Sequence, residues 1–236
     1  MYRDIWPPRV VLLGMAVLLG AVFSLAGCGG GAGDPLSDLS RTLRGMPTYS
    51  IVLDDMREEG NFFKNYYHQY RIVTPEKSIT SGWRKVSKDF YNRYLPFLGM
   101  TIYVKKDGQE TANMGPPGYE YVGDSRYGRW RQDSSGRSFW EFYGQYAFMA
   151  SLLGSRPIYR DSYTTYRTHW SSGRPYYGPQ REYGTNGSVT KQKKPDFYSR
   201  RMSAVGKSKT SFGNKVNQRI GRSKTSIRSR SRSVGK

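Results

Sequence analysis

The chain has 236 residues and a formal net charge of +20, from 38 Lys and Arg against 18 Asp and Glu. This length suffices for one domain with an extension. A single cysteine excludes a disulfide within the chain, so the core must hold by packing alone. Two histidines and one cysteine also exclude a zinc site of ordinary composition.

The N-terminus has the layout of a secretory signal peptide. Arg3 and Arg9 outweigh Asp4, and the uncharged apolar run 10–24 follows directly. Small residues end the run, which is the order that signal peptides show. The alternative is an uncleaved membrane-spanning helix, but the run is at the lower limit for spanning. The pattern therefore predicts a signal peptide over residues 1–27.

The end of this run carries a more specific pattern, Leu25-Ala26-Gly27-Cys28, in which Cys28 is the only cysteine of the chain. These four residues resemble the lipobox of bacterial lipoproteins. The resemblance implies that the Cys28 thiol receives a diacylglyceryl group and that cleavage makes Cys28 the acylated, palmitate-type mature N-terminus. Gly29 after the cysteine implies the outer membrane in a Gram-negative cell. The resemblance covers residues 1–28 and implies nothing about the rest.

Glycines after Cys28 indicate a flexible tether over residues 28–45, with a helical turn or two over 38–44. Two strands follow, 48–56 and 64–74, rich in β-branched and aromatic residues and separated by turn residues. They predict an antiparallel hairpin. Apolar residues at helical spacing predict a helix over 83–94, ending before Pro96. A strand over 100–105 stops at the turn signal 106–108.

A second helix is predicted from Ser138 to Leu153. Ser138 and Glu141 have the spacing of a capping box, and Gly154 suits the position after the helix end. The elements together predict an α+β fold: one small domain over 46–155 with a short antiparallel sheet and two helices.

The charge is concentrated after that domain. Residues 156–236 hold 20 Lys and Arg against three acids, whereas residues 28–155 hold 16 against 14. Because Tyr, Arg, Gly, Ser and Lys dominate this region, the sequence predicts a long disordered basic tail over 156–236. The residues expected to bind anions are Lys191, Lys193, Lys194, Arg200, Arg201, Arg228, Arg230 and Arg232.

Few residues suggest chemistry. His68 has no second ligand nearby, which favours a structural role, and the acids at 54–55 and 58–59 are expected to be a solvated strand end. The many aromatic residues suit either a core or a stacking surface for sugars or bases. No catalytic residue, metal ligand or cofactor is predicted.

The sequence thus favours a non-enzymatic envelope lipoprotein, a binding or structural module. Its partners are the membrane, through acylated Cys28, and an anionic envelope polymer or lipid headgroups, through the basic tail. One alternative is an extracellular nucleic-acid binder, supported by the alternating Arg-Ser run 228–233. The other is an enzyme acting on sugars or cell wall, which a cleft with paired carboxylates would favour.

Overall fold

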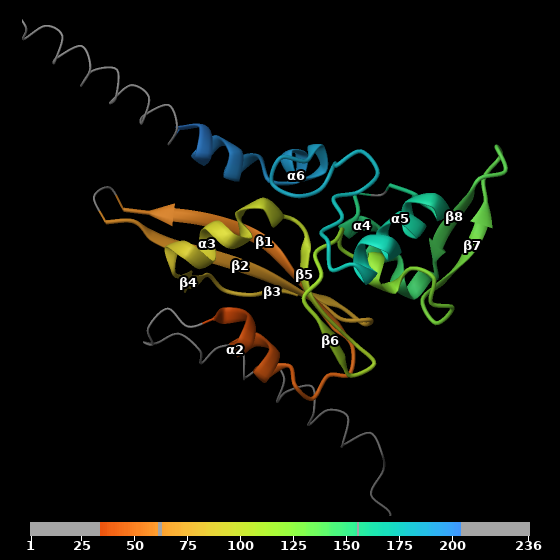
Figure 1. Ribbon diagram of the computed structural model, residues 1–236, viewed down its shortest axis with the longest axis horizontal. Coiled ribbons are helices and arrows are strands. Elements are labelled where there is room, and N and C mark those ends of the chain that lie inside the picture. The colour runs from red at the N-terminus through yellow and green to blue at the C-terminus, as the bar shows by residue number, and fades with distance from the viewer. Residues whose placement is uncertain (1–33, 61–62, 155, 204–236) are drawn as a thin grey trace, which may run out of the picture. The chain divides into compact units, whose positions relative to one another are not determined.

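The computed structural model describes residues 34–60, 63–154 and 156–203. Within these ranges the chain is α+β, as predicted, with two antiparallel sheets (Figure 1). The larger sheet has six strands in the order β3-β2-β1-β5-β6, and β4 also pairs with β2. Its strands are β1 (Tyr49–Glu59), β2 (Asn65–Val73), β3 (Ser78–Thr80), β4 (Arg84–Val86), β5 (Thr101–Lys106) and β6 (Gln109–Thr111).

The predicted hairpin forms the centre of this sheet. β1 and β2 pair antiparallel, and the register shifts by a β-bulge between Leu53 and Asp55. Strand alternation turns Ile51 and Leu53 into the core, and the extra residue of the bulge returns Met56 to the same core cluster. The bulge therefore fixes where the polar side chains of β1 point as well.

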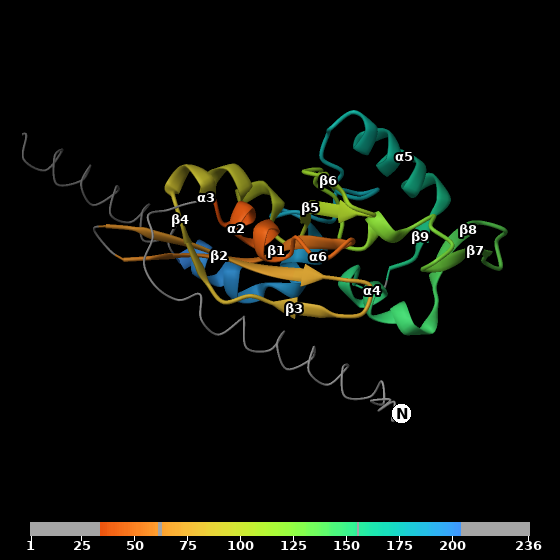
Figure 2. The same cartoon turned by 90° about the horizontal axis from the view of Figure 1, so that it is seen from below.

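α2 (Pro35–Thr42) packs beside the hairpin in both views (Figure 1, Figure 2). The Asp34 carboxylate accepts a hydrogen bond from the Leu36 amide at 3.0 Å and caps the helix. Leu36, Leu39 and Leu43 are buried in the core because they recur on one helix face. A flexible tether is therefore wrong for residues 34–43, and residues 28–33 lie outside the described ranges.

The helix predicted over 83–94 is shorter. α3 spans Lys88–Tyr94, and the Ser87 hydroxyl accepts a hydrogen bond from the Phe90 amide at 3.1 Å, which fixes its start. The residues before Ser87 form β4, whose backbone pairs with β2. The short 3₁₀ helix η2 (Leu95–Phe97) continues α3.

The smaller sheet replaces the first part of the helix predicted from Ser138 to Leu153. β8 (Ser138–Phe142) lies between β7 (Gly128–Gln132) and β9 (Ile158–Tyr159). Glu141 does not cap a helix. It pairs with Arg129 at 2.9 Å and Arg131 at 3.0 Å on the adjacent strand, and these cross-strand pairs, together with the aromatic alternation of β8, favour a strand.

Only the last part of that predicted helix is helical. The 3₁₀ helix η4 (Gly144–Tyr146) leads into α4 (Ala147–Leu152). Gly154 follows with a φ of +74°, so the predicted role of this glycine just after the helix end is confirmed.

The chain remains folded well beyond residue 155. α5 (Arg160–Ser171), α6 (Ser188–Lys193) and the helical residues 195–203 all belong to the described part. These helices and the segment between α5 and α6 bury apolar side chains that include Tyr166, Tyr176, Tyr183, Val189 and Phe197. The prediction of disorder from residue 156 is therefore wrong up to residue 203, because tyrosine supplies the apolar area that aliphatic residues supply elsewhere.

α4, α5 and the smaller sheet lie together at one end of the described chain in both views (Figure 1, Figure 2). The predicted signal peptide, the residues that resemble a lipobox, and residues 204–236 lie outside the described ranges. Among the helices that the structure describes, none combines the length and the apolar character needed to cross a membrane.

Candidate anion-binding site

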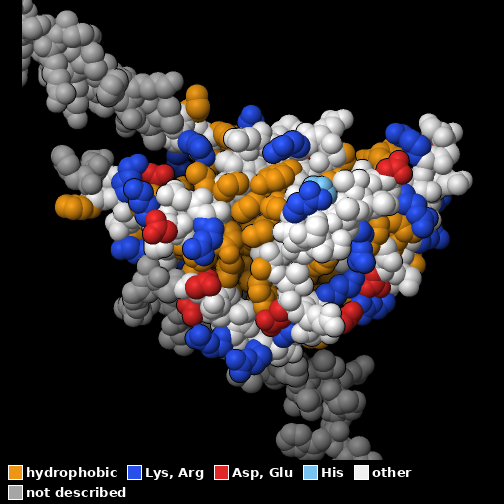
Figure 3. All heavy atoms as spheres, viewed as in Figure 1, with side chains coloured by type: hydrophobic (Ala, Val, Ile, Leu, Met, Phe, Trp, Pro, Cys, Tyr) orange, Lys and Arg blue, Asp and Glu red, His pale blue; other side chains and the backbone are white. Residues whose placement is uncertain are grey.

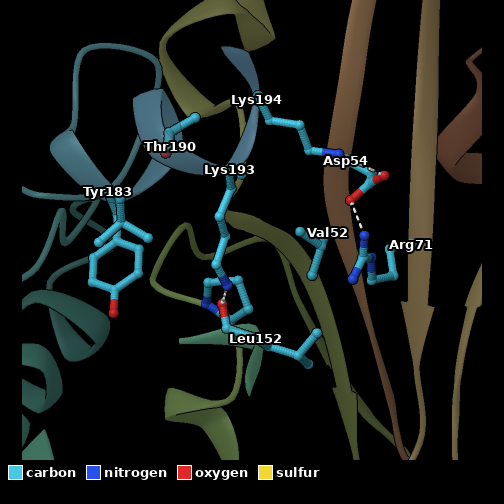
Figure 4. Close-up of a pocket in the computed structure, with 11 residues that line it drawn as sticks. Val52, Asp54, Arg71, Leu152, Tyr183, Thr190, Lys193 and Lys194 are labelled. Carbon is cyan, nitrogen blue, oxygen red and sulfur yellow. Dashed lines mark hydrogen bonds and ion pairs between the residues drawn. The ribbon is translucent and has the colours of Figure 1, made fainter. Parts of the chain in front are cut away.

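A buried carboxylate connects the central sheet to α6. Asp54, at the bulge of β1, is bonded to Arg71 of β2 at 2.7 Å and to Lys194, next to the end of α6, at 2.9 Å (Figure 4). The Asp54 side chain is only 9% exposed. Because two cations share one carboxylate, this cluster carries a net positive charge.

Lys193 reaches in the opposite direction. Its ammonium group donates hydrogen bonds to the carbonyl oxygens of Ser151 at 2.7 Å and Leu152 at 2.8 Å, at the end of α4. Carbonyls at a helix C-terminus attract a cation, since they have no partner within the helix. Nearby, the Tyr183 hydroxyl donates to the Leu153 carbonyl at 2.9 Å. The two neighbouring lysines therefore hold α6 to both the sheet and α4.

A cavity of about 220 Å³ lies between these groups, and Val52, Leu152 and Val189 supply part of its apolar lining. Its charged lining is Arg71, Lys193 and Lys194 against Asp54 alone. Burial lowers the pKa of Lys193, and the charges of Arg71 and Lys194 lower it further. Such a lining favours an anionic group, which would relieve the repulsion among the three cations.

Arg71 has an unused donor at this cavity. Its Nε is buried, and no described group accepts a hydrogen bond from it. A buried donor without a partner costs free energy, and a carboxylate or phosphate oxygen would satisfy it. The site is therefore suited to a small anionic group.

The structure separates the predicted anion-binding residues that it describes into three groups. Lys193 and Lys194 line the cavity, and Arg200 pairs with Asp55 at 3.1 Å. Lys191 and Arg201 are exposed. Arg228, Arg230 and Arg232 lie outside the described residues, as do the lipobox residues Leu25, Ala26, Gly27 and Cys28.

The expectation of a solvated strand end misses the role of Asp54 and Asp55. Both carboxylates bind basic residues about 140 positions later in the chain. The sequence features that correspond to these ion pairs are the acidic doublet 54–55 in a strand and the basic doublet 193–194. Charge complementarity alone, however, does not specify which acidic and basic residues form ion pairs in the fold.

His68 has the structural role that its missing partners suggested. Its ring is fully buried among aromatic rings, and Nδ1 lies 3.0 Å from the Tyr70 hydroxyl. Burial lowers the pKa of His68 to about 3, which keeps the ring neutral. Within the described ranges no three His, Cys, Asp or Glu residues cluster as a metal site would require.

Positive charge is also spread over the described surface. The described residues hold 26 Lys and Arg against 17 Asp and Glu. Figure 3 shows Lys and Arg side chains distributed around a hydrophobic strip on the face seen in Figure 1. The folded part thus has a basic character of its own.

Comparisons with protein-family models, with curated proteins and with solved structures each gave no match. A functional assignment must therefore rest on the residues of this chain.

Proposed function

We propose that the protein is a bacterial envelope lipoprotein that is anchored through acylated Cys28 and binds an anionic envelope component. In this role it is a non-enzymatic binding or structural module, and in a Gram-negative host its place is the outer membrane. The observation that carries the proposal is the charge distribution. Residues 204–236, called the basic segment below, contain ten Lys and Arg and no Asp or Glu.

The contacts of the folded part refine which residues serve this role. Lys193, Lys194 and Arg200 bind carbonyls and carboxylates of the fold, so the proposal assigns them first to holding α6 and the residues after it. The proposal assigns the binding of a polymer or lipid surface to exposed Lys191 and Arg201 and to the basic segment, which includes Arg228, Arg230 and Arg232. Each basic residue near an anionic bilayer contributes about 1 kcal/mol.

The anchor is tested by processing in a bacterial host. Cys28→Ala should leave an unprocessed precursor that incorporates no labelled fatty acid, whereas Gly31→Ala, three residues on, should be processed and labelled like the wild type. The mass of the mature N-terminal peptide would show diacylglyceryl modification of Cys28. Processing and labelling that are unchanged in Cys28→Ala would contradict the anchor.

A further inference from the structure

A second cavity, of about 400 Å³, lies between the β5–β6 hairpin, the 3₁₀ helix η3 (Tyr119–Tyr121) and α5. Tyr163, Tyr166 and Trp170 of α5 line one wall, together with Tyr119. These α5 residues are three and four positions apart and therefore share one helix face. The Tyr166 ring lies 5.5 Å from that of Trp170 and 6.1 Å from that of Tyr163. Tyr119 and Tyr166 are buried, so the half-buried rings of Tyr163 and Trp170 form the accessible part of this wall.

Glu120 of η3 lines this cavity, and one of its two carboxyl oxygens has no hydrogen-bond partner among the described residues. The residue is 93% buried, since its relative exposure is 7%, and no described group donates a hydrogen bond to its Oε1. Burial raises the pKa of Glu120, while the Ser50 hydroxyl and the charge of Lys106 oppose this shift. A buried polar group without partners is costly, and a ligand that supplies hydroxyl or amide hydrogens would satisfy it.

Lys106 does not serve as that partner. Its ammonium group donates to the main-chain oxygen of Glu120 at 3.0 Å and lies 3.2 Å from the Asp124 carboxylate. Lys106 therefore leaves Oε1 of Glu120 without a partner among the described residues.

The formal charges of the lining cancel. Lys106 and Arg167 face Asp107 and Glu120, and Gln109 and Thr111 add neutral polar groups at the β5–β6 end. This balance contrasts with the cationic cavity at Asp54, where three cations surround one carboxylate. A neutral lining disfavours nucleotides and other anions and favours an uncharged ligand with many hydroxyl groups.

We propose that this cavity binds one or two pyranose rings of an uncharged saccharide. The apolar C–H face of a pyranose packs on the aromatic wall, and its hydroxyl groups bond to Glu120, Gln109 and Arg167. The volume lies within the range of small-ligand pockets, about 300–1,000 Å³. This site is separate from the anion-binding role in position, charge and ligand class.

The test uses the full-length chain, purified in detergent and titrated with neutral trisaccharides built from glucose, mannose, galactose or N-acetylglucosamine. Tryptophan fluorescence and ligand-observed NMR report binding. At least one trisaccharide should bind saturably, with an affinity that does not change between about 50 and about 200 mM salt, since no counterions are released. Binding of an anionic partner, in contrast, depends strongly on salt. The two activities are therefore measured separately, and a failure to bind trisaccharides would not contradict the proposed function.

Three variants localise the binding. Trp170→Ala should weaken it by up to about tenfold, as expected for loss of an aromatic contact. Arg167→Ala, at an exposed position, should weaken it without loss of fold. The matched control is Trp83→Ala, a half-buried tryptophan next to β4, which should leave the affinity unchanged. Circular dichroism confirms that each variant is folded.

The proposal is overturned if none of the four trisaccharides binds. It is also overturned if binding survives both Trp170→Ala and Arg167→Ala in folded protein, or if uncharged nucleosides bind at this cavity and the trisaccharides do not.

Discussion

His68 shows how burial sets the chemistry of a single residue. In sequence it is an isolated histidine in a strand, for which the missing ligands exclude a zinc site. In the structure its ring contacts Phe90, Tyr91 and Tyr94, which explains its lowered pKa. The sequence indicates the structural role. These aromatic rings around His68 belong to α3, however, and no local sequence pattern predicts where α3 packs.

We expect His68 to make the fold sensitive to acid. Its pKa is about 3 in the folded chain and 6.5 ordinarily, so the unfolded state binds more protons between these values. The stability is therefore present above pH 6.5 and is lost as the pH falls toward 3, by a few kcal/mol. When urea unfolding is measured at several pH values, the free energy of unfolding of His68→Phe should fall less with decreasing pH than that of the wild type. Phe90→Leu, which keeps the imidazole, should retain the wild-type dependence of the free energy of unfolding on pH. The same dependence in all three proteins would contradict the burial argument.

Glu120 should produce the opposite pH dependence. Its pKa is raised above the usual 4.5 by burial, so the folded state holds its proton to higher pH than the unfolded state does. The associated stability is complete below pH 4.5 and is lost as the pH rises through the folded pKa. Glu120→Gln cannot titrate, so its stability relative to the wild type should increase with pH. A constant difference across that range would show that Glu120 is hydrated when folded.

At the level of elements, local patterns predict the β1–β2 hairpin and the strand β5 well. They fail where one pattern suits two structures. Ser138 and Glu141 fit a helix cap, yet the same segment pairs with β7, where Arg129 lies opposite Glu141 and Arg131 also forms an ion pair with it. The pairing of β8 with β7 determines the structure of this segment, and a single sequence does not reveal which strands pair.

The link between α6 and the sheet depends on Asp54. Asp54→Asn removes the carboxylate that Arg71 and Lys194 share and leaves two partly buried cations unpaired. We expect a loss of up to about 3 kcal/mol, at the low end for a broken buried ion pair. The matched variant is Asp55→Asn, whose partner Arg200 is 46% exposed, with an expected loss under about 1 kcal/mol. Chemical denaturation measures both, and equal losses would show that the Asp54 cluster does not hold α6.

The end of the folded part is a second test at this scale. A chain of residues 34–203 keeps every described element, whereas a chain of residues 34–154 lacks six buried apolar side chains, including Tyr166 and Phe197. The longer chain should unfold cooperatively on heating, and the shorter one should show no cooperative transition. A cooperative transition in both would restore the domain boundary at residue 155 that composition suggests.

For the whole molecule, composition identifies the basic C-terminal region but misplaces its beginning. Residues 156–203 and residues 204–236 each contain ten Lys and Arg, but all seven tyrosines of this region precede residue 204. Tyr166, Tyr176 and Tyr183 are buried, and the lysines at 193–194 are bonded within the fold. The cavities are not predictable from the sequence, because each is lined by segments far apart in the chain. The candidate anion site therefore needed the structure, whereas the candidate lipid anchor rests on four residues of sequence.

The central claim is that the basic segment binds an anionic surface, and co-sedimentation with vesicles tests it most directly. The vesicles contain equal parts phosphatidylglycerol and phosphatidylcholine, with pure phosphatidylcholine as the neutral control. The proteins are residues 34–236, residues 34–203, and residues 34–236 with positions 204–236 shuffled. Residues 34–236 and the shuffled protein should bind alike to the anionic vesicles, and their binding should weaken as salt rises from about 50 to about 200 mM. Residues 34–203 should bind much less, since ten Lys and Arg are missing. Equal binding by residues 34–203 and residues 34–236, or binding that salt does not affect, would contradict the claim.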